Sequence, residues 1–146
     1  MLSVTFSARG REFDVDAFVA EFEICDKEDV FHRGDKRFRR RPPLRESGFR
    51  LALFGDDDPK RRDALTEAVR TVTAFLEEEH TAIDRLRALQ VTLEISFMFG
   101  VGPGCDCVAR YLTFPDRFLQ ILGERGITLE TMCCLCSESE PTGGSR

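Results

Sequence analysis

Residues 91–99 read VTLEISFMF, and this stretch decides the class of fold. Its odd-numbered positions are all apolar, and they alternate with residues that are mostly polar. A period of two is typical of a strand with one buried face. Strands of this one-sided kind predict an antiparallel or mixed sheet with helices packed on one face.

Four other stretches are expected to be strands. Residues 3–8 and 48–54 alternate in the same way as 91–99, and strands are also predicted at 107–114 and 127–135. The glycine-rich residues 100–104 would join the strands at 91–99 and 107–114 as a hairpin. They look superficially like a phosphate-binding loop, but a strand is expected after them where that motif needs a helix. An extra short strand near Phe38 stays an open alternative.

The first two helices are predicted from their caps and apolar spacing. Asp14 or Asp16 would cap a short helix that ends near residues 23–26. Asp58 would be the N-cap of a long helix reaching about residue 79, with Pro59 at its first position. Whether that helix breaks at residue 80 is open, since Thr81 with Asp84 resembles a second capping box.

A third helix is expected near residues 115–125. Pro115 would lie in its first turn, with Thr113 or Asp116 as the cap, and Gly126 would end it in the left-handed conformation. The predicted class is therefore α+β, with the order β-α-β-α-β-β-α-β and about three helices packed on the sheet. Residues 1–136 would form a single domain, followed by a flexible tail at 137–146 that is rich in glycine and serine.

Composition indicates a globular chain. Of the 146 residues, 42% are hydrophobic, with thirteen Phe, one Tyr and no Trp, and most of the Phe rings should lie in a core. No apolar run approaches the ~20 residues of a membrane span. The first residues lack the pattern of a signal peptide. We therefore expect a cytoplasmic protein whose six cysteines are mostly reduced.

Charge is distributed unevenly along the chain. Residues 33–62 hold eleven Lys or Arg against five Asp or Glu, a net charge of +6, whereas the rest of the chain carries −11. Such asymmetry indicates a contact surface for partners. The candidate interaction surface comprises Arg33, Arg37, Arg39, Arg40, Arg41, Asp56, Asp57 and Asp58.

The arginine stretch at 33–50 also carries Phe38 and Phe49. Arginines interleaved with aromatic residues can bind phosphates and stack on bases, so nucleic-acid binding is an alternative. The acidic remainder of the chain argues against it. The simpler interpretation is a solvated loop whose arginines pair with the protein's own carboxylates.

The cysteines suggest a metal or redox alternative. Four thiolates in tetrahedral geometry would hold zinc. The candidates are Cys105, Cys107, Cys133, Cys134 and Cys136. Their spacing is not that of paired C-x-x-C motifs, and free cysteine is commonly a small buried hydrophobe. No cofactor is therefore favoured.

No Ser or Cys nucleophile has an identifiable His partner, so we expect no enzyme. The leading hypothesis is a protein–protein interaction module, in one version an immunity protein that neutralises a toxin. Acidic charge would complement a basic toxin and speed its association. Homo-oligomerisation stays open.

The order of features resembles a bacterial family known only as domain-of-unknown-function family 4279. The resemblance covers about residues 3–136, from the opening strand and the Asp-rich helix entry onward. It rests further on HRGD at 32–35, SGFRL at 47–51, LTFPD at 112–116 and LGERGITL at 122–129. Phe49 stands near the place where the family often has a tryptophan. The resemblance implies an α+β domain and no activity.

Overall fold

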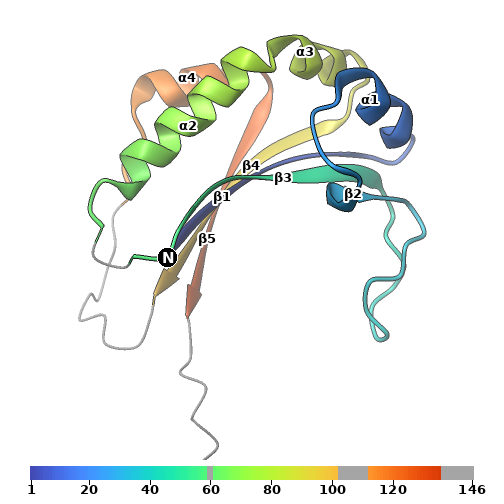
Figure 1. Ribbon diagram of the computed structural model, residues 1–146, viewed down its shortest axis with the longest axis horizontal. Coiled ribbons are helices and arrows are strands. Elements are labelled where there is room, and N and C mark those ends of the chain that lie inside the picture. Colours follow the sequence, from blue (N-terminus) through green and yellow to red (C-terminus); the bar gives the residue numbers. More distant parts are fainter. Residues whose placement is uncertain (59–60, 102–111, 136–146) are drawn as a thin grey trace, which may run out of the picture.

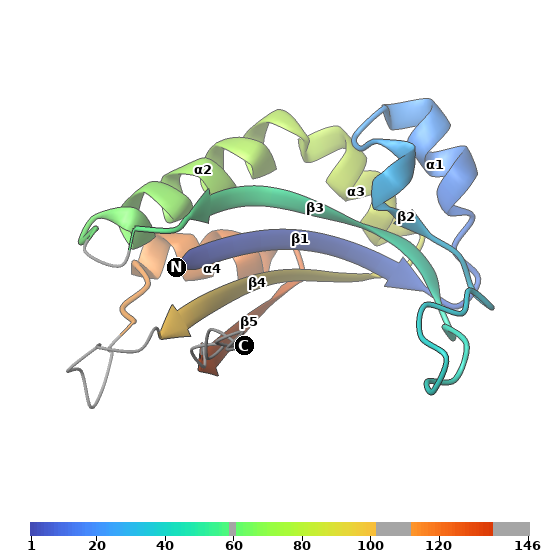
Figure 2. The ribbon, with the colours of Figure 1, turned by 60° about the horizontal axis from the view of Figure 1, so that its bottom comes forward.

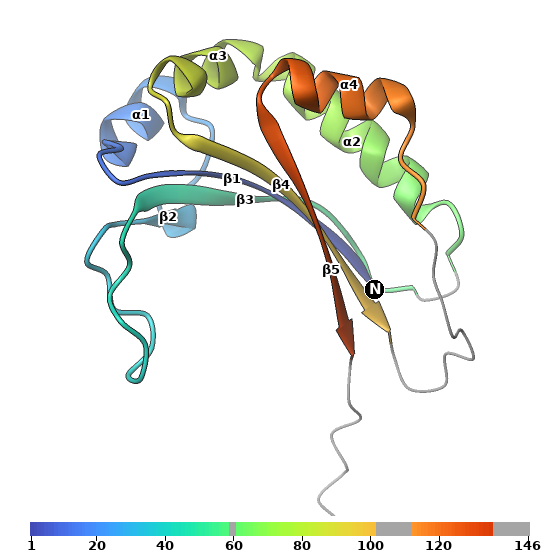
Figure 3. The same cartoon turned by 180° about the vertical axis from the view of Figure 1, so that it is seen from behind.

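The computed structural model describes residues 1–58, 61–101 and 112–135 of the chain. Its five-stranded sheet has the order β2-β3-β1-β4-β5, and the helices cover one face of it (Figures 1 and 3). The strands are β1 Leu2–Gly10, β2 Val30–Phe31, β3 Ser47–Asp56, β4 Thr92–Val101 and β5 Ile127–Leu135. Neighbouring strands are antiparallel except β4 and β5, which run parallel. The predicted α+β class with a mixed sheet is confirmed.

The central strand β1 shows how the period of two builds the core. Val4, Phe6 and Ala8 are completely buried against the helices, whereas the residues between them lie on the opposite face. β1 pairs with β3 on one side and with β4 on the other. The stretch at 91–99 forms most of β4. Its side chains at Leu93, Ile95, Phe97 and Phe99 are buried as expected.

Four α-helices and one 3-10 helix lie in the described part of the chain. They are α1 Val15–Phe22, η1 Lys27–Asp29, α2 Ala64–Glu78, α3 His80–Ala88 and α4 Asp116–Glu124. Asp14 is the N-cap of α1, and its carboxylate accepts a hydrogen bond from the backbone N–H of Ala17 at 3.2 Å. This confirms the first of the two caps proposed for that helix.

The predicted start of the long helix is wrong. α2 begins at Ala64, and Asp63 rather than Asp58 occupies its N-cap position. The Arg61 guanidinium binds the carboxylates of Asp56 and Asp63, together with that of Glu67. These ion pairs hold the segment before Ala64 against the end of β3, so the helix starts only after it. Pro59 lies outside the described residues.

The open question at residue 80 is settled by a break at Glu79. Its backbone angles, φ −98° and ψ 22°, depart from helical values, and α3 begins directly afterwards. Thr81 therefore lies inside α3, so it is not the residue of a second capping box. The break divides the predicted long helix in two, which is why the described chain has four helices instead of about three.

The predicted hairpin after β4 is wrong. β4 pairs with β1 along one edge and with β5 along the other, so no edge remains for a following strand. Residues 102–111, which include most of the predicted turn and of the predicted strand at 107–114, lie outside the described residues, and residues 112–114 have no strand structure. The chain instead passes through α4 before it returns as β5, as a parallel pair requires. The described order is therefore β-α-β-β-α-α-β-α-β, counting α-helices and strands.

Two smaller predictions around the turns also need correction. The short strand is β2 at Val30–Phe31, while the N–H of Arg41 closes a turn onto the carbonyl of Phe38. Pro115 occupies the N-cap position of α4 instead of its first turn, so neither predicted residue caps that helix. Gly126, with φ +65°, has the predicted left-handed conformation.

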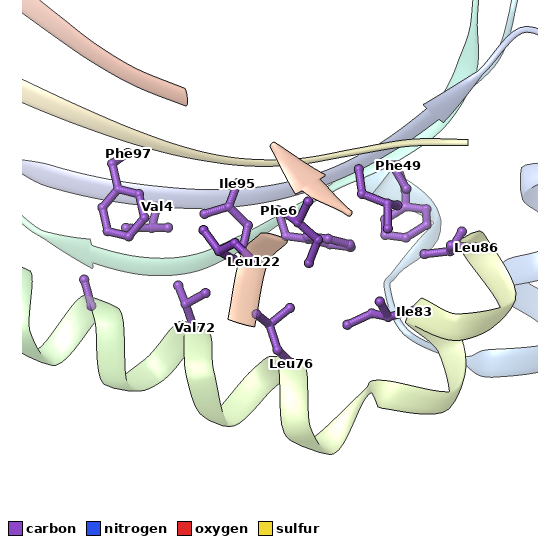
Figure 4. Close-up of a cluster of buried hydrophobic side chains, with 14 of the residues drawn as sticks. Val4, Phe6, Phe49, Val72, Leu76, Ile83, Leu86, Ile95, Phe97 and Leu122 are labelled. Carbon is purple, nitrogen blue, oxygen red and sulfur yellow. The ribbon is translucent and has the colours of Figure 1, made fainter. Parts of the chain in front are cut away.

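The core lies between the helices and the sheet (Figure 4). Val72 and Leu76 of α2 and Ile83 of α3 point toward the apolar face of the strands. Phe rings supply much of its volume, and most of them are buried or packed against it, as predicted. The exceptions are Phe31 and Phe38, and Phe38 has 61% of its surface exposed.

Candidate functional site

The arginine-rich stretch forms an ordered loop between β2 and β3, which we call the arginine loop (residues 32–46). It extends away from the helical layer (Figures 1 and 2). The N–H of Gly34 donates to the carbonyl of Leu44 at 2.8 Å, and the N–H of Leu44 donates to the carbonyl of Asp35 at 2.9 Å. Gly34 has φ +93°, which favours glycine at this turn. The base of the loop is thus held by its own backbone.

Most of the loop's guanidinium groups have no carboxylate partner among the residues that the structure describes. Within the described residues, Arg33 alone among the loop's arginines forms an ion pair, with Glu12 at 3.3 Å. Arg37 lies over the ring of Phe31 at 5.3 Å, and Arg41 lies over the exposed ring of Phe38 at 5.5 Å. The expectation that the arginines pair with the protein's own carboxylates is therefore wrong for this loop.

Arg11 also lies beside the base of the arginine loop, although sequence reasoning did not include it. With Arg33 and Arg45 it lines an open hollow of about 590 Å³. Glu46 also lines the hollow, and its carboxylate forms an ion pair with Arg9 at 3.6 Å. Strand pairing explains the arrangement, since Gly10 lies opposite Ser47 and the residues beyond each strand end meet. The lining of this hollow is therefore more basic than acidic.

The acidic half of the predicted interaction surface lies elsewhere. Asp56 ends β3, whereas the arginine loop precedes its first residue, Ser47. A strand rises about 3.3 Å per residue, so ten residues separate the two groups by roughly 30 Å. The N–H of Asp58, and then Arg61, hold the pKa of the Asp56 carboxyl below its usual value. The structure therefore divides the predicted surface into two separate parts.

A second groove, of about 690 Å³, lies between α1 and the segment that follows it. His32 Nε2 lies 2.9 and 2.8 Å from the two carboxylate oxygens of Asp16 on α1. Asp35 accepts the backbone N–H of His32 at 2.8 Å. This pair joins the start of the arginine loop to α1. No local sequence pattern indicated it, because the two side chains are sixteen residues apart.

Cys25 lines the same groove as His32. Burial, followed by the negative charges of Asp29 and Asp26, raises the pKa of its thiol to about 11. A thiol with such a pKa stays protonated at neutral pH and is a poor nucleophile. The groove therefore does not combine an activated cysteine with its histidine.

We expect the pKa of His32 to lie above its ordinary value of 6.5, because the hydrogen bond and charge of Asp16, with Asp35, favour the imidazolium. The pair's contribution to stability should be complete below the unfolded pKa and should disappear as the pH rises through the folded pKa. NMR titration of the His32 ring measures this shift. Asp16→Asn should move the pKa back toward 6.5. An equal pKa in both proteins would contradict the role given to Asp16.

The described cysteines do not gather into a metal centre. Cys133 and Cys134 are neighbours in β5 and so point to opposite faces of the sheet. Cys133 pairs with the buried Phe99, and Cys134 pairs with Gly100. Cys105, Cys107 and Cys136 lie outside the described residues. Among the residues that the structure describes, no three His, Cys, Asp or Glu side chains could together hold a metal ion.

Comparisons with known proteins found no similar protein. The chain matches no protein-family model, no curated protein and no solved structure. The resemblance to family 4279 therefore stays a prediction. None of the helices in the described ranges is long and apolar enough to span a membrane.

Proposed function

We propose that this chain is a protein-binding module that contacts an anionic surface of its partner through the arginine loop. One observation carries the proposal. The loop presents Phe38, 61% exposed, beside Arg39, Arg40 and Arg41, none of which forms an ion pair in the described part of the chain. Aromatic residues and arginine are the side chains most enriched in the centres of protein interfaces.

Order within the loop supports the same proposal. Hydrogen bonds at Gly34 and Leu44 hold its base, and the N–H of Arg33 donates to Ser47 Oγ at 2.8 Å. A surface that is ordered before binding loses less conformational entropy when it binds. A basic loop on a chain with a net charge of −5 also orients an anionic partner as it approaches.

A triple variant tests the loop: Phe38→Ser, Arg39→Glu and Arg40→Glu. We expect its affinity for a partner captured from the native host to fall at least about 30-fold, because removing one interface hot spot costs about 2 kcal/mol or more. Affinity is measured with the purified partner by biolayer interferometry. Arg70→Glu with Arg117→Glu, on α2 and α4, is the control for charge. A partner bound equally well by the triple variant and by the control would contradict the proposal.

An immunity protein is a second form of protein-binding module that the charge distribution supports. It would use a different surface from the arginine loop, because the residues outside 33–62 carry a net charge of −11, which would complement a basic nuclease toxin. Co-expression with the product of a neighbouring gene tests it by bacterial growth. Failure to protect cells from any toxic neighbour would remove this version and leave the binding module.

Nucleic-acid binding is the second candidate, favoured by the contact between Arg41 and the exposed Phe38 ring. Such a pair can stack on a base while the other arginines contact phosphates. Four arginine–phosphate contacts would give a slope near −3 in a plot of log affinity against log salt, at about −0.7 per contact for single strands. Fluorescence anisotropy with labelled single-stranded DNA and RNA measures this slope. The absence of binding at low salt would exclude this candidate.

A further inference from the structure

A small hollow opens on the face of the sheet that the helices leave uncovered. It has a volume of about 360 Å³ and lies where β1, β2 and β3 meet the arginine loop. This volume is at the lower end of the range for small-molecule sites. Thr5 and Ala52 are paired across β1 and β3 and form its floor.

Phe31 and Leu44 add apolar walls to this hollow. Gly48 makes room for the Phe31 ring, because a Cβ on this glycine would lie 2.8 Å from Phe31 Cζ. The guanidinium of Arg37 lies over the same ring at 5.3 Å from its centroid. The ring therefore serves both as a wall and as the support that positions one cationic group at the hollow.

Charges of both signs line the hollow. Arg37 and Arg50 line it together with Glu28 and Asp29 of η1. Among the ion pairs of the described residues, none involves any of these four side chains. A charged group that has no ion-pair partner, at the rim of a water-filled hollow, is available to a ligand.

We infer that this hollow binds a small zwitterion, such as a free apolar amino acid or a dipeptide. The ligand's carboxylate would bind Arg50 and Arg37, and its ammonium group would face Glu28 and Asp29. Its apolar side chain would contact Phe31, Leu44 and Ala52. A polyanion fits less well, because the two carboxylates would repel it. This inference does not depend on the proposed protein-binding function.

Isothermal titration calorimetry on the full chain tests the inference, with L-leucine, L-phenylalanine and the dipeptide Leu-Leu as probes. N-acetyl-L-leucine lacks the ammonium group, and L-leucinamide lacks the carboxylate. We expect a zwitterion to bind, and each blocked analogue to bind at least about tenfold more weakly, because each loses a charge-assisted contact. Binding of either the amino acid or the dipeptide supports the inference.

Arg50→Gln is the matched variant, because Arg50 lies on β3 outside the arginine loop. It should weaken binding at least about tenfold, whereas Arg70→Gln on α2 should leave it unchanged, and circular dichroism checks that both are folded. No binding of any probe at about 10 mM overturns the inference. Equal effects of the two variants, or inorganic phosphate binding as tightly as the zwitterions, overturn it as well.

Discussion

Replacing Phe49 by alanine is expected to lower the free energy of unfolding by about 3–5 kcal/mol. The Phe49 side chain is fully buried, and its ring stacks on that of Phe18, with 5.9 Å between their centroids. It also contacts the rings of Phe6 and Phe13. Figure 4 shows the ring between the sheet and α3. Its removal would leave a cavity that three other rings surround.

Urea unfolding followed by far-ultraviolet circular dichroism measures this loss, since the chain has no tryptophan for fluorescence. Phe38→Ala makes the same substitution at an exposed ring, and its effect should stay within about 0.5 kcal/mol. Similar losses in the two variants would contradict the packing of Phe49 among the rings of the core.

Gly48→Ala should destabilise the fold by about 3 kcal/mol, at the upper end of the usual range for overpacking. A Cβ at this position would lie 2.1 Å from the carbonyl oxygen of Ala8 and 2.8 Å from the Phe31 ring. The first contact is with the backbone of β1, so no side-chain rotation can relieve it. Either β3 must move away from β1 or their pairing must break.

Gly55→Ala in the same strand is the matched control for Gly48. Nothing lies within 4 Å of a Cβ added at Gly55, so its effect on the free energy of unfolding should stay within about 0.5 kcal/mol. Both variants are compared with the wild type in the same urea titration. A Gly48→Ala protein as stable as the Gly55→Ala protein would contradict the close approach of β1 and β3.

The strands were predictable because each carries its own pattern. The alternation at 91–99 corresponds to the buried face of β4, and the same holds for β1. The hairpin after β4 was wrong because alternation shows that a stretch is a strand without showing which strand pairs with it. A hairpin would have paired residues 107–114 with β4. The strand that pairs there is β5, which lies more than twenty residues further along the chain than β4.

The start of a helix can also depend on contacts that its local residue types do not reveal. Asp58 and Pro59 have the residue types of a helix start, but the helix begins at Ala64. The decisive contacts are those of Arg61 with Asp56 and with the first turn of α2. Asp14 was predicted correctly because its hydrogen bond is to Ala17, three residues away.

The candidate site was partly predictable. Four of the five residues at 37–41 are arginines, so their high local charge is visible in the sequence. The pair between His32 and Asp16 was not predictable, and neither was the approach of Arg11 to Arg45. Each joins residues that only the folding of distant segments brings together.

The sequence by itself determined the α+β class, most strands, the core faces of the helices and the basic character of residues 33–41. These features depend on residues within a few positions of one another, whose periodicity and charge can be read directly. Only the tertiary structure decided the parallel pairing of β5, the separation of the arginines from Asp56–Asp58, and the hollow between Arg50 and Glu28. Those features depend on which distant segments meet, because pairing and packing are interactions through space.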